Sequence, residues 1–139
     1  TRYARVTGVQ TCALPILGIG CDIIEIERIA RAIKRESFIR RVFTAEEAAY
    51  CQRRGQQAAA SFAARFAAKE AVLKALGTGL REGSLQEIAV DNDGLGKPLV
   101  QLSGHFAMLA KQLGVKNIQI SLSHSRELAT AYVIMEDDK

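Results

Sequence analysis

The stretch SFAARFAAKEAVLKALG, residues 61–77, decides the fold of this chain. Apolar side chains recur through it at helical spacing, and Gly77 follows the last of them, so we predict a helix from Ser61 to Leu76. The large apolar residues share one face: Phe62, Phe66, Leu73 and Leu76. The opposite face is almost all alanine: Ala64, Ala67, Ala68, Ala71 and Ala75. Such small residues predict close packing against a neighbour rather than contact with water.

The same helix carries four charges on two otherwise apolar faces. Arg65 and Lys69 lie four residues apart, where like charges repel each other unless an anion lies between them. Glu70 and Lys74 are also four apart, in the favourable order. The charges either form intrahelical pairs at the edge of a core helix or bind a charged ligand, and the pattern leaves both open.

Upstream of this helix, residues 16–21 (ILGIGC) predict a buried strand whose glycines allow another group to approach the backbone. Isoleucines at helical spacing from Ile26 predict the first helix. Thr44 and Glu47 form a capping box that opens a second helix, which stops near Gly55.

Downstream, we expect strands over residues 85–90, 118–122 and 128–135, with turn residues at 91–96. Ser103 can cap a helix that closes at Gly114. Helices and strands follow an irregular order, so the expected class is α+β: a small single domain with an antiparallel sheet packed against helices.

Asp22 has two interpretations. With Glu25 it has the spacing of a capping box for the first helix. Alternatively, Asp22 and Glu70 meet and hold a divalent cation, because Mg²⁺ commonly takes one or two protein carboxylates together with phosphate oxygens and water.

Arg28, Arg31 and Arg35 form a basic stripe opposite the isoleucines of the first helix. Such a stripe is either a solvated face or a docking surface for something acidic. His124 ends the strand over residues 118–122, where it either makes a local hydrogen bond or reaches a bound phosphate.

Composition limits the other possibilities. A chain of 139 residues with 48% hydrophobic residues favours one domain with a core that needs no disulfide or structural metal. The net charge is only +4, and the three cysteines form no CxxC motif, which favours a reducing compartment. Apolar runs fall short of the ~20 residues that cross a bilayer, so we expect no membrane insertion.

Residues 1–15 lack periodicity and are expected to be a non-native or disordered leader, with the domain over residues 16–139.

Taken in order, several motifs closely resemble those of holo-acyl carrier protein synthase, a 4′-phosphopantetheinyl transferase family. They are GIGCDII (18–24), RFAAKEA (65–71) with Lys74, GTG (77–79), GKP (96–98) and SLSH (121–124). Each motif alone is weak, but the ordered set is specific and spans residue 16 to the C-terminus.

The resemblance implies the 4′-phosphopantetheinyl transferase fold and a Mg²⁺-dependent cytoplasmic enzyme of fatty acid biosynthesis. It implies transfer of phosphopantetheine from coenzyme A to a serine of an acidic acyl carrier protein, releasing 3′,5′-ADP. The metal ligands would be Asp22 and Glu70. From the chemistry of the transfer, we expect the catalytic residues to be Glu70, alone or through a water that it shares with the metal, as the base and Lys74 as the candidate for protonating the leaving phosphate. Coenzyme A would meet Arg65, Lys69, Lys74, Gly77 and His124. The carrier protein would dock on Arg28, Arg31 and Arg35, and the family is typically a homotrimer with active sites between subunits.

Two other classes compete. A small basic nucleic-acid-binding module could use the basic residues from Arg28 to Arg41, but the chain has no Trp and three Tyr as stacking platforms. That interpretation also leaves Asp22 and Glu70 without a role, and no nucleic acid is expected. A metal-dependent phosphatase is disfavoured because the few carboxylates make a two-metal site improbable.

Overall fold

The computed structural model describes residues 15–137 of the chain. The strands are β1 (Ile16–Glu25), β2 (Ile88–Asn92), β3 (Pro98–Leu102), β4 (Asn117–His124) and β5 (Leu128–Glu136). The helices are α1 (Ile26–Ala32), α2 (Glu36–Val42), α3 (Ala45–Gln52), α4 (Ala58–Leu76) and α5 (Gly104–Leu113), with short 3₁₀ turns η1 (Gly55–Gln57) and η2 (Leu85–Glu87). The α+β class predicted from the sequence is confirmed. The predicted leader lies outside the described residues except for Pro15.

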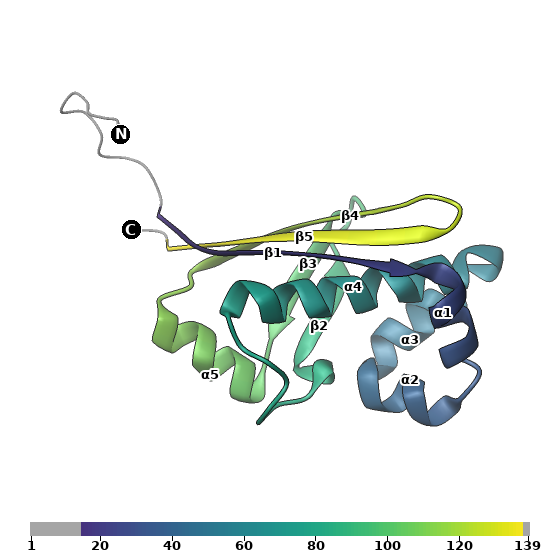
Figure 1. Ribbon diagram of the computed structural model, residues 1–139, viewed down its shortest axis with the longest axis horizontal. Coiled ribbons are helices and arrows are strands. Elements are labelled where there is room, and N and C mark those ends of the chain that lie inside the picture. The colour runs from purple at the N-terminus through teal and green to yellow at the C-terminus, as the bar shows by residue number, and fades with distance from the viewer. Residues whose placement is uncertain (1–14, 138–139) are drawn as a thin grey trace.

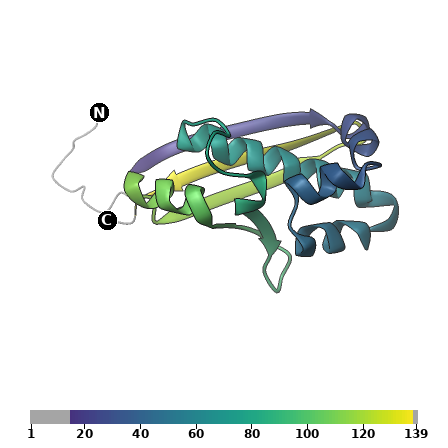
Figure 2. The same ribbon diagram turned by 90° about the horizontal axis from the view of Figure 1, so that it is seen from below.

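A three-stranded antiparallel sheet of order β1-β5-β4 covers α4, and a separate β2-β3 hairpin lies beside it. In Figure 1, α4 runs beneath the sheet, α5 lies under one end, and α1, α2 and α3 lie under the other. No element covers the opposite face of the sheet among residues 15–137 (Figure 1). Seen from below, the β2-β3 hairpin projects from the body (Figure 2).

The alanine face of α4 packs against the chain's own sheet. Ala67, Ala68 and Ala71 have no exposed surface. A methyl group at Gly18 of β1 would overlap the carbonyl oxygen of Ala75, and one at Gly20 would overlap that of Ala71. The predicted close approach to the β1 glycines is therefore confirmed, and the approaching group is the backbone of α4.

β1 differs from the prediction in length and burial. It continues to Glu25, so Asp22 lies inside a strand opposite Ala131 of β5, and α1 begins only at Ile26. The helix-cap interpretation of Asp22 is therefore wrong, because pairing with β5 outweighs the local capping signal. β1 is also half exposed rather than buried, since Ile19 and Ile23 face away from α4.

The expected first helix is broken in two. Arg35 is extended (φ −97°, ψ 118°) and stands at the N-cap of α2, so Arg28, Arg31 and Arg35 do not form one continuous helical stripe. The break lets Phe38 of α2 pack against Phe43 and Phe66, each with ring centroids 6.2 Å away.

The C-terminal half follows the prediction with local differences. The expected strand over residues 85–90 begins with η2 and becomes β2 only at Ile88, while β3 was not predicted. Ser103 stands at the N-cap of α5 without a side-chain capping bond, and Gly114 closes the helix at φ 87°. No helix in residues 15–137 is long and apolar enough to cross a membrane.

A buried ion pair joins α3, α4 and β2. Lys69 Nζ donates to Glu47 Oε1 (2.8 Å) and to the carbonyl oxygens of Leu85 (3.0 Å) and Ile88 (2.7 Å). Glu47 also accepts from the backbone N–H of Thr44 in the predicted capping box, and from that of Val90 (2.7 Å). Burial lowers the pKa of Lys69, and the carboxylate of Glu47 acts against that shift.

We expect Lys69→Met to lower the free energy of unfolding by about 3–5 kcal/mol, because it leaves a buried carboxylate without its cation. Urea unfolding monitored by circular dichroism measures the change. Lys111→Met, at an exposed position of α5, is the matched control. A loss no larger than that of the control would contradict a structural role for the Lys69–Glu47 pair.

Candidate functional site

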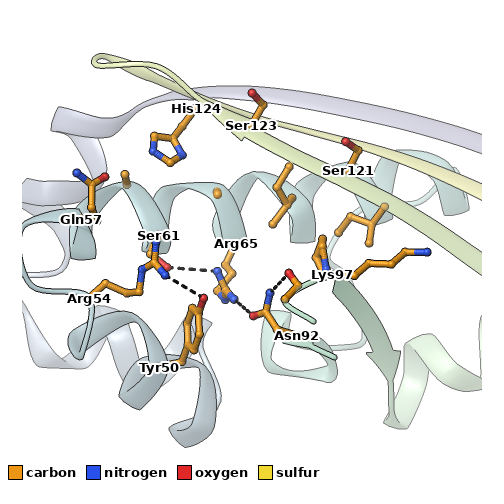
Figure 3. Close-up of a pocket in the computed structure, with 16 residues that line it drawn as sticks. Tyr50, Arg54, Gln57, Ser61, Arg65, Asn92, Lys97, Ser121, Ser123 and His124 are labelled. Carbon is orange, nitrogen blue, oxygen red and sulfur yellow. Dashed lines mark hydrogen bonds between the residues drawn. The ribbon is translucent and has the colours of Figure 1, made fainter. Parts of the chain in front are cut away.

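A cavity of about 430 Å³ lies between the start of α4, the β2-β3 turn and the end of β4. Arg54, Arg65, Lys97 and His124 line it, and we call it the cationic cavity. Figure 3 shows Arg65 between Ser61, Tyr50 and Asn92, with His124 across the cavity. Four basic or protonatable side chains in one hollow make it suited to a polyanionic ligand.

Arg65 is the buried cation of this cavity, with 4% of its surface exposed. Its Nη2 donates to Asn92 Oδ1 (2.5 Å) and its Nη1 to Ser61 Oγ (3.3 Å). Its guanidinium lies 4.3 Å from the centroid of the Tyr50 ring. Within residues 15–137, its Nε is the one buried side-chain nitrogen or oxygen without a hydrogen-bond partner. A buried donor without an acceptor is costly, so the guanidinium has capacity left for an anion.

Tyr50 organises the arginines on this side. Arg54 donates from Nη1 to the hydroxyl of Tyr50 (3.4 Å), and its guanidinium lies 5.7 Å from the ring centroid. Tyr50 therefore contacts both Arg54 and Arg65. Sequence reasoning missed Tyr50, Arg54 and Asn92, because only the packing of α3 and the hairpin against α4 brings them together.

A second cavity, of about 450 Å³, contains the two candidate metal ligands. Asp22 of β1 and Glu70 of α4 line it together with Arg28 and Arg35, and we call it the carboxylate cavity. Burial raises the pKa of Glu70; the nearby carboxylate of Asp22 raises it further, and Lys74 lowers it. The coupling places Asp22 and Glu70 close enough to interact electrostatically.

Lys74 is the counter-ion of Asp22. Its Nζ donates to Asp22 Oδ1 (3.2 Å) and to the carbonyl oxygen of Cys21 (2.9 Å). Its side chain is 55% exposed, so the ammonium lies at the surface beside the carboxylates rather than in the cationic cavity.

The donor set fits a hard cation that keeps part of its own shell. Residues 15–137 contain no group of three or more His, Cys, Asp or Glu side chains that could enclose a metal. Two carboxylates fit Mg²⁺, which is usually bound through one or two carboxylates plus substrate phosphates and water. Asp22 and Glu70 are therefore the residues that would hold it.

Besides Lys74, three residues assigned from the resemblance line neither the cationic nor the carboxylate cavity. Lys69 has no exposed surface and uses its three donors inside the core, so the structure contradicts a role in binding coenzyme A. Gly77 ends α4 in a left-handed conformation (φ 76°), which accounts for the glycine without a ligand. Arg31 pairs with Glu27 (3.5 Å) on the surface and does not line the carboxylate cavity.

The two cavities share no lining residue. Arg65 and Glu70 are five residues apart on α4, which at ~100° per residue turns them about 140° away from each other. One chain thus presents its cationic and carboxylate cavities on different sides of the same helix.

Comparison with known proteins identifies the family of this chain. Residues 18–133 match the ACPS family, described as the 4′-phosphopantetheinyl transferase superfamily. The chain is 49% identical over 124 residues to a holo-[acyl-carrier-protein] synthase of Trichlorobacter lovleyi, covering 87% of this chain and 98% of the relative.

Two solved structures are similar as well. The holo-[acyl-carrier-protein] synthase of Neisseria meningitidis aligns with a TM-score of 0.81 at 34% identity, over 88% of this chain and 100% of the other. The synthase of Bacillus anthracis in complex with CoA (3′,5′-ADP) aligns with a TM-score of 0.74 at 38% identity, over 90% and 99%. The fold, the motifs and these relatives agree, and the chain belongs to the 4′-phosphopantetheinyl transferase superfamily.

Proposed function

We propose that this chain is a holo-acyl carrier protein synthase, which transfers 4′-phosphopantetheine from coenzyme A to a serine of an apo acyl carrier protein. The observation that carries the proposal is the pairing of the cationic cavity with the carboxylate cavity on one helix. The comparisons favour this transferase over the nucleic-acid-binding alternative, because every relative described above is a holo-acyl carrier protein synthase.

Coenzyme A is the ligand we assign to the cationic cavity. Arg65 and His124 line it, as expected from the sequence, and Arg54 and Lys97 add charge. The nucleotide end of coenzyme A carries several phosphate groups, which such a set of cations neutralises. The unpaired Nε of Arg65 supports an anion at this place.

The transfer step belongs to the carboxylate cavity. The serine hydroxyl of the carrier attacks the β-phosphate of coenzyme A; the Oγ–P bond forms and the P–O bond to 3′,5′-ADP breaks. Glu70, or a water that it shares with the metal, is our candidate for accepting the serine proton. Lys74 is the candidate for protonating the leaving phosphate. Mg²⁺ on Asp22 and Glu70 would supply charge neutralisation at the phosphate oxygens.

Arg28 and Arg35 are the residues we propose for docking the acidic carrier protein. Both are exposed and both line the carboxylate cavity, so a carrier bound there has its serine close to Glu70. Arg31 is a weaker candidate than the sequence indicated, because Glu27 already partners it.

We further propose that the active enzyme is a homotrimer with sites between subunits. The uncovered face of the β1-β5-β4 sheet exposes Ile19 (69%), Ile23 (60%) and Tyr132 (58%), a large apolar surface for a lone chain. If the cationic cavity of one subunit faces the carboxylate cavity of the next, coenzyme A can reach both. The alanine face of α4 is already buried by the chain's own sheet, so it does not supply this contact.

A cytoplasmic location completes the proposal. Cys21 and Cys51 are free thiols, which persist in a reducing compartment.

The first test is removal of the carboxylates. Asp22→Ala and Glu70→Ala should each abolish transfer at any Mg²⁺ concentration while leaving the circular dichroism spectrum unchanged, because neither carboxylate belongs to the core. Mass spectrometry of the carrier after incubation with coenzyme A measures the product. Near-normal transfer by Asp22→Ala at low Mg²⁺ would remove Asp22 from the metal site.

The second test concerns assembly. Tyr132→Lys should convert the oligomer to monomers, because it places a charge on the apolar sheet face, and light scattering measures the mass. Met108→Lys, at an exposed apolar position on α5, is the control. An active Tyr132→Lys monomer would contradict the proposal.

Mixed subunits show whether the sites are shared. At a coenzyme A concentration far below the KM of Arg65→Ala, Glu70→Ala and Arg65→Ala chains should each show little activity alone and should regain part of the wild-type activity after subunit exchange. An inactive mixture that light scattering shows to be fully assembled would place each active site within one chain.

The third test separates the two substrates. Arg28→Glu should raise the KM for the carrier protein by about tenfold or more, with a salt-dependent effect, and leave the KM for coenzyme A nearly unchanged. Steady-state kinetics with each substrate varied in turn measures both constants. An equal rise in the KM for the carrier protein and in the KM for coenzyme A would mean that Arg28 acts on the chemistry and not on docking.

A further inference from the structure

Asn92 joins the two walls of the cationic cavity. Its Oδ1 accepts from Arg65 Nη2 (2.5 Å), and its Nδ2 donates to the carbonyl oxygen of Gly96 (2.9 Å). Arg65 belongs to α4, whereas Gly96 belongs to the β2-β3 turn, next to Lys97. Figure 3 shows the amide between the guanidinium and the turn.

The hairpin turn is already closed by its own residues. Asp93 Oδ1 accepts from the backbone N–H groups of Leu95 (2.8 Å) and Lys97 (2.9 Å). Gly96 takes up φ 91°, which a residue with a side chain rarely adopts. The Asn92 amide is therefore not needed to close the turn. Its contact with Arg65 instead affects the orientation of the arginine side chain.

The contact with Asn92 bears on the direction in which the guanidinium of Arg65 points. Arg65 has a long side chain, and within residues 15–137 its guanidinium stacks on Tyr50 and donates to Ser61 and Asn92. The bond to Asn92 is the shortest of these polar contacts. It directs one nitrogen to the hairpin while Nε keeps a donor without a partner.

We infer that Asn92 is a positioning residue for coenzyme A, which acts through Arg65 by holding its guanidinium against the hairpin that carries Lys97. This inference rests on the proposed binding of coenzyme A in the cationic cavity. An amide suits the position because it accepts from an arginine and donates to a carbonyl at once, whereas an aspartate would lose the donor and neutralise the arginine.

The test is a double-mutant cycle in the full enzyme with Mg²⁺, coenzyme A and carrier protein. Asn92→Ala should raise the KM for coenzyme A about tenfold, since a hydrogen bond to a charged group is lost, with the carrier KM within about twofold of wild type. Arg65→Ala should raise the KM for coenzyme A further. The double variant should equal Arg65→Ala, because Asn92 has nothing to position once the arginine is gone.

Asn117→Ala is the matched control. Asn117 also donates a side-chain bond, to Glu136 Oε1 (3.0 Å), but does not line the cationic cavity. Both variants should keep the wild-type circular dichroism spectrum, and the KM of Asn117→Ala for coenzyme A should stay at the wild-type value.

Three results would overturn the inference. Additive losses in the double variant would mean that Asn92 acts independently of Arg65, and an unchanged KM in Asn92→Ala beside a raised KM in Arg65→Ala would mean that the arginine needs no positioning. An unchanged KM in Arg65→Ala would overturn the coenzyme A assignment of the cavity itself, a failure that the cycle keeps apart from the other two.

Discussion

The buried pair of Lys69 and Glu47 is the interaction on which the rest of the structure depends. It satisfies each donor of one ammonium and joins α3, α4 and β2, which no local sequence signal connects. Breaking such a pair leaves an uncompensated charge in the core, so it penalises other arrangements of these elements. Val90 is held by Glu47, and Asn92 follows two residues later, so the same pair fixes where the hairpin meets Arg65.

α4 divides the molecule into two chemical sides. The alanines of α4 allow the glycines of β1 to lie against the helix backbone. The side chains of Arg65 and Glu70 lie to either side of this contact. Arg65 points to the cationic cavity and Glu70 to the carboxylate cavity. A rigid core helix is a good support for such groups, because packing fixes their directions before a ligand binds.

The separation of the cationic cavity from the carboxylate cavity has a consequence for the assembly of subunits. If the proposed phosphate-rich substrate binds to the cations, it must also reach the carboxylates, and within one chain the two cavities are separate. No element of residues 15–137 covers the apolar face of the sheet opposite α4, which is suited to contact between subunits. Assembly and catalysis would then depend on the same surface, and the bare sheet would be as important to activity as the charged residues.

Local signals in the sequence were sufficient to predict the α+β class, the extent of α4 to within three residues and the capping box at Thr44. They also indicated Asp22 and Glu70 as candidate metal ligands. These features depend on helical periodicity and short motifs, which extend over a few residues. Long-range contacts, in contrast, make Lys69 a core residue, place Asp22 in a strand and bring Asn92 to Arg65. A lysine four residues from an arginine looks the same in sequence whether it faces a ligand or a buried glutamate 22 residues away. The difference is decided by long-range packing, because a charge enters the core only where distant groups supply its counter-ion and its hydrogen bonds.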